Sequence, residues 1–402
     1  MALMESRTNI PIVEANRGKG DIADFSIAIV GGLALALTTL FICVVPFSGT
    51  IAGSRDFGIY WATGQQLAHH ANPYDPDAMK RLEASLNVYN GYQVLFMRNP
   101  PWALPLALPL GFLGVRVGAF LWSIVLLACL LVSVHTLWVM HGRPNNQLHW
   151  LGYSFAPALL CLLMGQTSLF ALLGFVLFLR FHHAHPFLAG MSLWLCALKP
   201  HLFLPFGAVL LVWVLVSRNY RLLAGAVAAI AASCTVLYFI DPMAWSQYAQ
   251  MMRTSGIVKE FLPCPSIALR HWVSPQTTWL PYLLPVLACA WALGYYWHRR
   301  HAWDWLKEGS MLMLVSVFVA PFCWLFDQAL VIPAMLQGAY RTRIRILLVV
   351  LALASVVIEI ELLRGVNLTS PLYLWTAPAW VVWYLFASAS LGKTRDVRPP
   401  SR

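Results

Sequence analysis

The apolar run FSIAIVGGLALALTTLFICVVPF, residues 25–47, decides the class of fold. It holds no charged side chain and is long enough to cross about 30 Å of hydrocarbon as an α-helix. The whole chain shares this character, since 59% of its 402 residues are hydrophobic and only 11% are charged. Soluble domains usually carry about a quarter of charged residues. We therefore predict an all-α, polytopic membrane protein.

Further apolar runs predict about twelve crossings, several of them short. The runs lie near residues 25–47, 117–140, 149–164, 167–181, 186–198, 202–216, 222–240, 279–297, 310–324, 327–339, 344–363 and 371–390. The segment NPPWALPLALPLGFLG, residues 99–114, is treated as interfacial or re-entrant. We expect one transmembrane domain over residues 1–402. Its parts are cytoplasmic tails at 1–23 and 391–402 and large outer loops at 50–100 and 241–278.

The basic residues orient the chain. With the N-terminus in the cytoplasm, most of the 27 lysine and arginine residues fall on the inner side, as the positive-inside rule requires. The net charge of +11 is scattered between apolar runs and forms no basic stripe, which argues against a nucleic-acid partner. In this orientation the isolated polar groups Asp56, Gly165-Gln166, Lys199-Pro200-His201 and Asp327 all reach the outer face. We predict a multi-pass protein of the cell membrane that works on its periplasmic or extracytoplasmic side.

A short helix is predicted at the start of the first outer loop. Its residues Phe57, Tyr60, Trp61, Gly64, Leu67 and Ala68 recur at helical spacing. The aromatic face favours a position along the membrane surface, and Asn72-Pro73 ends the helix. Asp56 then has two interpretations: the N-cap of this helix, or a catalytic carboxylate at the lipid boundary.

Five stretches, in order, resemble the landmarks of glycosyltransferase family 87. They are RDFGIYWATGQQLAHHANPYDP (55–76), NPPWALPLALPLGFL (99–113), MGQTSLFALLGF (164–175), GMSLWLCALKPHLFLPF (190–206) and VAPFCWLFDQALVIPAM (319–335). That family comprises C-type (GT-C) membrane glycosyltransferases that use polyprenyl-phosphate sugars, including polyprenol-phosphate-mannose-dependent mannosyltransferases. The resemblance implies a GT-C helical bundle, a polyprenyl-phosphate sugar donor, and a lipid or glycan acceptor.

The resemblance also implies roles for particular residues. In the family, an acidic residue at the start of the first outer loop acts as the general base, and Asp56 stands at that position. Trp324-x-x-Asp327 stands at the position of the late family landmark. This sequence departs from the family pattern in two ways, because WLFDQ lacks the histidine that is common in the late landmark and His201 follows the Lys-Pro pair. If the donor is β-linked and the product α-linked, one in-line displacement inverts the anomeric carbon, and no covalent intermediate is expected.

The predicted site has three parts. Asp56 is the base; Lys199, His201 and Arg55 bind the donor phosphate; Gln166, Asp327, Tyr60, Trp61 and Trp324 bind sugar or acceptor. Plainer interpretations remain open. Lys199 would snorkel to the interface, Gln166 would cap a turn, and Asp327 would be a helix N-cap. No metal or cofactor is expected, since no zinc-ligand spacing occurs.

The loop at 241–278 carries Trp245, Tyr248, Met251 and Met252 at the spacing of one helix face, which predicts a second surface helix able to cover the acceptor. A transporter or lipid flippase is the main rival function, although its usual internal repeat is not evident here. Within the same fold, an arabinosyltransferase is a second rival. The preferred interpretation is a hexosyltransferase that transfers mannose or another hexose.

Overall fold

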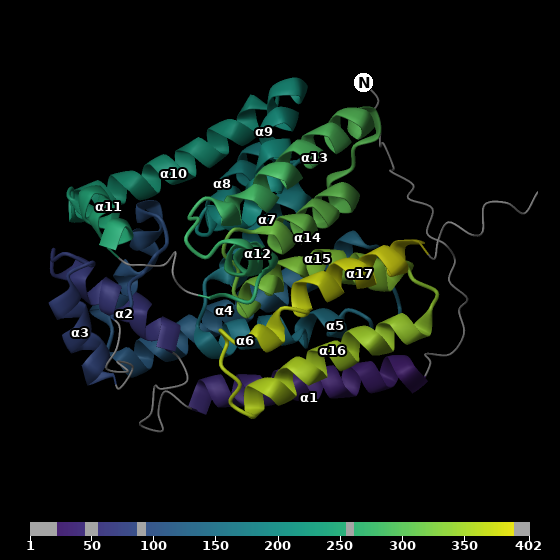
Figure 1. The fold of residues 1–402 in the computed structure, drawn as a ribbon, viewed down its shortest axis with the longest axis horizontal. Helices are drawn as coiled ribbons and strands as arrows, with labels where there is room; N and C mark the ends of the chain where they lie inside the picture. The colour runs from purple at the N-terminus through teal and green to yellow at the C-terminus, as the bar shows by residue number, and fades with distance from the viewer. Residues whose placement is uncertain (1–21, 45–54, 87–93, 255–260, 390–402) are drawn as a thin grey trace, which may run out of the picture.

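The computed structural model describes residues 22–44, 55–86, 94–254 and 261–389, without the side chains of 22–25 and 55. Within these ranges the chain is helical and has no β-strand, as predicted (Figure 1). The two predicted tails lie outside the described residues, apart from 22 and 23, which belong to the first helix.

Six helical segments of the described chain are long and apolar enough to cross a membrane. They are built on α1 (Ile22–Val44), α4 (Val115–Met140), η4 (Pro200–Phe203) with α9 (Leu204–Ser217), α10 (Tyr220–Ile240), η6 (Leu280–Tyr282) with α13 (Leu283–Arg299) and η7 (Arg300–Ala302), and α16 (Arg345–Leu363). These segments make the protein a multi-pass membrane protein by length and composition.

Shorter helices fill the spaces between the long ones. They are α5 (Trp150–Tyr153), α6 (Ala156–Met164), α7 (Ser168–Phe181), α8 (Pro186–Cys196), η8 (Trp305–Gly309), α14 (Ser310–Val319), η9 (Leu325–Val331), α15 (Ile332–Arg341), η10 (Pro371–Tyr373) and α17 (Thr376–Ala389). Every predicted apolar run therefore contains a helix. The number of crossings, predicted as about twelve, stays a prediction because short helices do not reveal by length alone whether they span.

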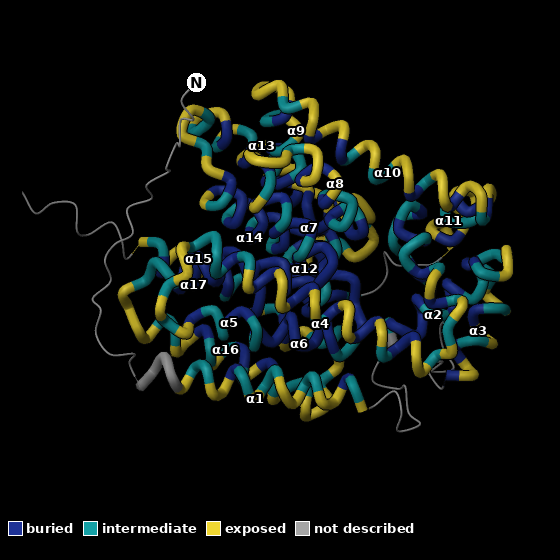
Figure 2. The backbone as a smooth tube through the Cα atoms, turned by 180° about the vertical axis from the view of Figure 1, so that it is seen from behind, coloured by how far each residue is buried: buried dark blue, intermediate teal, exposed yellow. Residues whose placement is uncertain are grey.

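Burial separates an inner group of helices from an outer one (Figure 2). Helix α7 lies at the centre, and most of its residues are buried. By contrast, only 11% of the apolar window of α1 and 17% of that of α10 are buried. Most of the exposed residues of these outer helices are apolar, including Leu33 at 58% and Val227 at 56%. Such a surface is stable against lipid and costly in water.

The predicted first-loop helix exists as α2 (Arg55–Ala68), followed by α3 (Pro76–Ser85). Its aromatic face, however, packs against protein instead of the membrane surface, since Phe57 is 1% and Tyr60 is 4% exposed. The Tyr60 ring lies 5.4 Å from that of Trp122 in α4. The face of α2 that carries Gly64 packs instead on the proline-rich segment at 99–113, which forms the short 3-10 helices η2 (Pro101–Leu106) and η3 (Leu108–Phe112). Prolines lack a backbone donor and interrupt α-helices, so this segment does not form a span and remains available as a packing surface.

Close backbone contact fixes α2 on η3. A Cβ atom on Gly64 would lie 2.3 Å from the carbonyl oxygen of Ala107. Beside it, the Gln65 side-chain amide donates to the carbonyl of Gly111 at 2.9 Å. The glycine of the predicted helix thus serves helix docking, because only glycine permits this approach.

The second outer loop contains α11 (Ala244–Thr254) and α12 (Pro265–Val273). The predicted surface helix is α11. Its Tyr248 ring lies 5.9 Å from that of Tyr74, and its Trp245 ring lies 5.8 Å from that of Trp102. Figure 1 shows α11, α2 and α3 together at one end of the molecule. Residues 50–54, 87–93 and 255–260 of these two loops lie outside the described residues.

Candidate functional site

A tight turn between α6 and α7 forms the floor of the site. Gly165 adopts a left-handed backbone with φ of 73°, which ends α6 and leads through Gln166 into α7. A Cβ atom on Gly165 would lie 2.9 Å from the Cβ of Phe57 in the first turn of α2. The Trp122 indole also donates to the Gly165 carbonyl at 2.7 Å. The turn therefore holds Gln166 beside the start of α2, where Asp56 lies.

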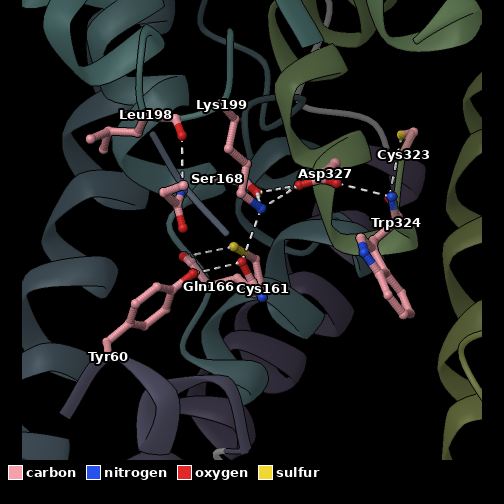
Figure 3. A network of polar contacts seen from close by, with 10 residues as sticks. Tyr60, Cys161, Gln166, Ser168, Leu198, Lys199, Cys323, Trp324 and Asp327 are labelled. Atoms are coloured by element: carbon pink, nitrogen blue, oxygen red, sulfur yellow. Dashed lines mark hydrogen bonds and ion pairs between the residues drawn. The ribbon is translucent and has the colours of Figure 1, made fainter. Parts of the chain in front are cut away.

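Lys199 enters this floor from the junction between α8 and η4. Its ammonium donates to Gln166 Oε1 at 2.9 Å, to Ser168 Oγ at 2.9 Å and to Asp327 Oδ1 at 2.7 Å (Figure 3). An ammonium has three donors, so all of them have acceptors within the protein. Lys199 is only 8% exposed and does not snorkel to the surface.

Asp327 divides its two carboxylate oxygens between two partners. Oδ1 accepts from Lys199 and from Ser168 Oγ, the latter at 2.6 Å. Oδ2 accepts from the backbone N–H of Trp324 at 2.9 Å, which stabilises the start of η9. The N-cap interpretation of Asp327 is therefore wrong in detail, because Trp324 is the N-cap and Asp327 is the third residue of η9, whose carboxylate holds the helix start and pairs with Lys199. Its side chain is almost fully buried, and a buried pair needs such additional hydrogen bonds.

Tyr60 connects this network to α2. Its hydroxyl donates to Gln166 Oε1 at 3.2 Å. Burial raises the pKa of the Tyr60 phenol, and the neighbouring Asp56 carboxylate raises it further. Asp56 lies one helical turn before Tyr60 and is half-buried. Because α2 begins at Arg55, Asp56 falls within the first turn and not at the N-cap, in a position where the helix dipole stabilises a negative charge.

The remaining predicted residues lie around the network. His201, in η4, is half-buried and within electrostatic reach of Asp327 and Lys199. The Trp324 ring stacks on that of Phe326, with centroids 5.7 Å apart. Trp61 does not join the network; its indole donates to the Leu113 carbonyl at 3.0 Å and anchors α2. The side chain of Arg55 lies outside the described residues.

Two members of the site were missed by sequence reasoning. Ser168 touches both Lys199 and Asp327, and its only sequence signal is its place directly after the Gly-Gln-Thr turn. Phe326 presents its ring 4.9 Å from the Lys199 ammonium, a cation–π contact. Over the described part of the chain, no group of three or more histidine, cysteine, aspartate or glutamate residues is placed to hold a metal ion.

A family model described as "Glycosyltransferase family 87" matches residues 96–326, which is more than half of the chain. The chain belongs to this family. Membership in glycosyltransferase family 87 makes the protein a membrane glycosyltransferase, with a sugar donor and an acceptor as substrates, and removes the transporter interpretation. No curated protein and no solved structure matches the chain. The matched segment includes Gln166, Lys199 and Trp324, whereas Asp56 and Asp327 lie outside it.

Proposed function

We propose that this family 87 glycosyltransferase moves mannose or another hexose from a polyprenyl-phosphate donor to an acceptor hydroxyl. We place the reaction at the extracytoplasmic membrane face, with Asp56 as general base. One observation carries the proposal: the half-buried carboxylate of Asp56 lies one helical turn before Tyr60, whose hydroxyl donates to Gln166, and Gln166 also accepts from the buried Lys199 ammonium.

The chemistry requires only one proton acceptor. The acceptor oxygen bonds to the anomeric carbon, its proton passes to Asp56, and the bond to the donor phosphate breaks with its electron pair on the phosphate. That leaving group needs no proton, so no general acid is required. A base must also be reachable by the substrate. Asp327 is 1% exposed, whereas Asp56 is only partly buried, which favours Asp56 for this role.

The donor phosphate requires positive charge. Lys199 supplies it, but a direct contact requires its ammonium to release one of three protein acceptors. We propose that it releases Gln166, because the neutral amide oxygen is a weaker acceptor than a carboxylate. Gln166 is then free for a sugar hydroxyl. In this scheme His201 and Arg55 flank the phosphate, while Tyr60, Trp61, Trp324 and Asp327 shape the sugar and acceptor positions.

A transfer assay with the purified protein tests the proposal. The donors are synthetic polyprenyl-phosphate mannose and polyprenyl-phosphate arabinose, and a membrane lipid extract supplies acceptors. Asp56→Asn should lower the rate by about 10² to 10⁴, the usual contribution of a general base. Asp75→Asn is the matched control, because Asp75 is a carboxylate of the same loop that caps α3. Full activity in Asp56→Asn would refute the base, and transfer from the arabinose donor alone would favour the arabinosyltransferase alternative.

A further inference from the structure

Two side chains of the proline-rich segment hold the backbone from which Lys199 extends. The Asn99 amide donates to the carbonyl of Leu198 at 2.8 Å. The Trp102 indole donates to the carbonyl of Ala197, also at 2.8 Å. The two acceptors are consecutive carbonyls, and they directly precede Lys199 in the chain. Asn99 and Trp102 together therefore form a clamp on this stretch of backbone.

The sequence makes the clamp rigid. Pro100 and Pro101 separate Asn99 from Trp102. Proline fixes its own φ angle and keeps the preceding residue out of the helical region. Pro100 is extended, with φ of −57° and ψ of 154°. The two donors therefore keep a fixed spacing, and a donor pair that is already ordered loses little entropy when it binds its acceptors.

The backbone before Lys199 needs donors from elsewhere in the chain. Helix α8 ends at Cys196, with Ala197 as its C-cap, and the last carbonyls of a helix have no partner within it. Pro200 offers no backbone N–H and disfavours a helical conformation of Lys199, which lies at φ of −135° and ψ of 67°. Side-chain donors therefore fix the point from which the lysine side chain starts.

The clamp is itself anchored to two helices. The Trp102 carbonyl accepts from Ser233 Oγ of α10 at 2.6 Å. It also accepts from the Trp194 indole of α8 at 3.3 Å. A shift of the clamp would therefore break hydrogen bonds to both helices.

The two ends of the Lys199 side chain are thus held separately. Its ammonium is held by Gln166, Ser168 and Asp327, whereas its backbone is held by the clamp. In the proposed reaction the ammonium releases Gln166 to meet the donor phosphate. The position of the backbone then matters more, and a misplacement of about 1 Å at a reacting site can cost about 10²-fold in rate.

We infer that Asn99 and Trp102 are positioning residues that set Lys199 for the donor phosphate. They act through the lysine backbone and touch neither the sugar nor the acceptor. The inference rests on the proposed function and deepens it, because it makes the proline-rich segment a part of the donor site. A role in packing alone would lower stability without distinguishing the two substrates.

Steady-state kinetics of Asn99→Leu and Trp102→Phe test the inference. Leucine has nearly the size of asparagine and cannot donate, and phenylalanine keeps a ring without the N–H. We expect KM for the donor to rise about three- to tenfold in each variant, as for loss of one hydrogen bond, with KM for the acceptor unchanged. Trp138→Phe is the matched control and should alter neither value, because the Trp138 indole also donates to a loop carbonyl, that of Pro144 after α4. An unchanged donor KM in both variants, or an equal rise of both KM values, would overturn the inference.

Reductive methylation follows Lys199 without any sugar transfer. Formaldehyde and dimethylamine-borane methylate accessible lysines, and peptide mass spectrometry gives the rate at each one. Lys199 is 8% exposed and should react slowly in the unaltered protein. We expect about three- to tenfold faster reaction at Lys199 in Asn99→Leu and Trp102→Phe, with Lys307, whose side chain is 47% exposed, unchanged as internal reference.

The two measurements separate this inference from the proposed function. An unchanged Lys199 methylation rate in both variants would overturn the inference, even where the donor KM rises. Faster methylation in both variants of a protein that transfers no sugar would show that the clamp holds Lys199 and would refute the proposed function alone.

Discussion

Replacing Lys199 by methionine should weaken the fold as well as the chemistry. Methionine keeps much of the length of the side chain and removes its charge. Asp327, which is 1% exposed, would then keep its negative charge with only Ser168 Oγ and the Trp324 N–H as donors. An uncompensated buried charge is among the most costly defects a protein interior can hold.

The size of the effect follows from the burial of both partners. Lys199 and Asp327 lie 2.7 Å apart, with side chains 10% and 2% exposed. Removal of one member of such a pair costs about 3–5 kcal/mol. At about 2 °C per kcal/mol for a large chain, Lys199→Met should lower the unfolding temperature by about 6–10 °C. The double variant Lys199→Met/Asp327→Leu should recover most of this loss, because apolar side chains replace a buried pair at little cost.

Thermal unfolding in detergent, followed by tryptophan fluorescence, measures both variants. Unchanged unfolding of Lys199→Met, or a double variant no more stable than the single one, would refute the assignment of a buried, interdependent pair. The same proteins also separate structure from chemistry. We expect the double variant to regain stability and remain inactive in sugar transfer. Full activity in the double variant would show that Lys199 serves the fold alone.

Three further variants probe the α2 contact. Gly64→Ala should cost about 1–3 kcal/mol because its Cβ meets the Ala107 carbonyl, whereas Gly207→Ala, with no atom within 4 Å, should be neutral in the same melting assay. Gly165→Ala, at φ of 73°, should lose about 1–2 kcal/mol by the same measurement. Tyr60→Phe removes the hydroxyl that donates to Gln166 and should slow transfer by less than tenfold and lower the unfolding temperature by about 1–3 °C.

The sequence predicts the helices well and their surroundings less well. Each apolar run contains a helix, because hydrophobic length is a local property. The partner of the first-loop helix is not local. Its aromatic residues look equally suited to a membrane surface and to a protein surface, and only the packing of α2 on α4 and on the Gly165 turn shows that protein covers them.

The same distinction applies to the site. Lys199, Gln166 and Asp327 stand out in the sequence because polar residues are rare in apolar runs. Their mutual contacts are not visible in the sequence, because Lys199 bonds to Gln166, 33 positions away, and to Asp327, 128 positions away. Ser168 was not predicted because an uncharged serine is common in the first turn of a helix and does not stand out in the sequence. Whether Lys199 snorkels or is buried depends on whether Asp327 lies within reach, which no local pattern reveals.

The contacts also make the position of Asp56 depend on two separate supports. One is the buried pair, which fixes Gln166 and, through it, the Tyr60 hydroxyl. The other is the glycine contact of α2 with η3 at Gly64. Because the second support does not involve Lys199, its loss should displace Asp56 and leave the ion pair intact. Gly64→Ala should therefore lower the transfer rate even in detergent conditions where the protein stays folded, and an unaltered rate in such protein would mean that the docking of α2 does not position the base.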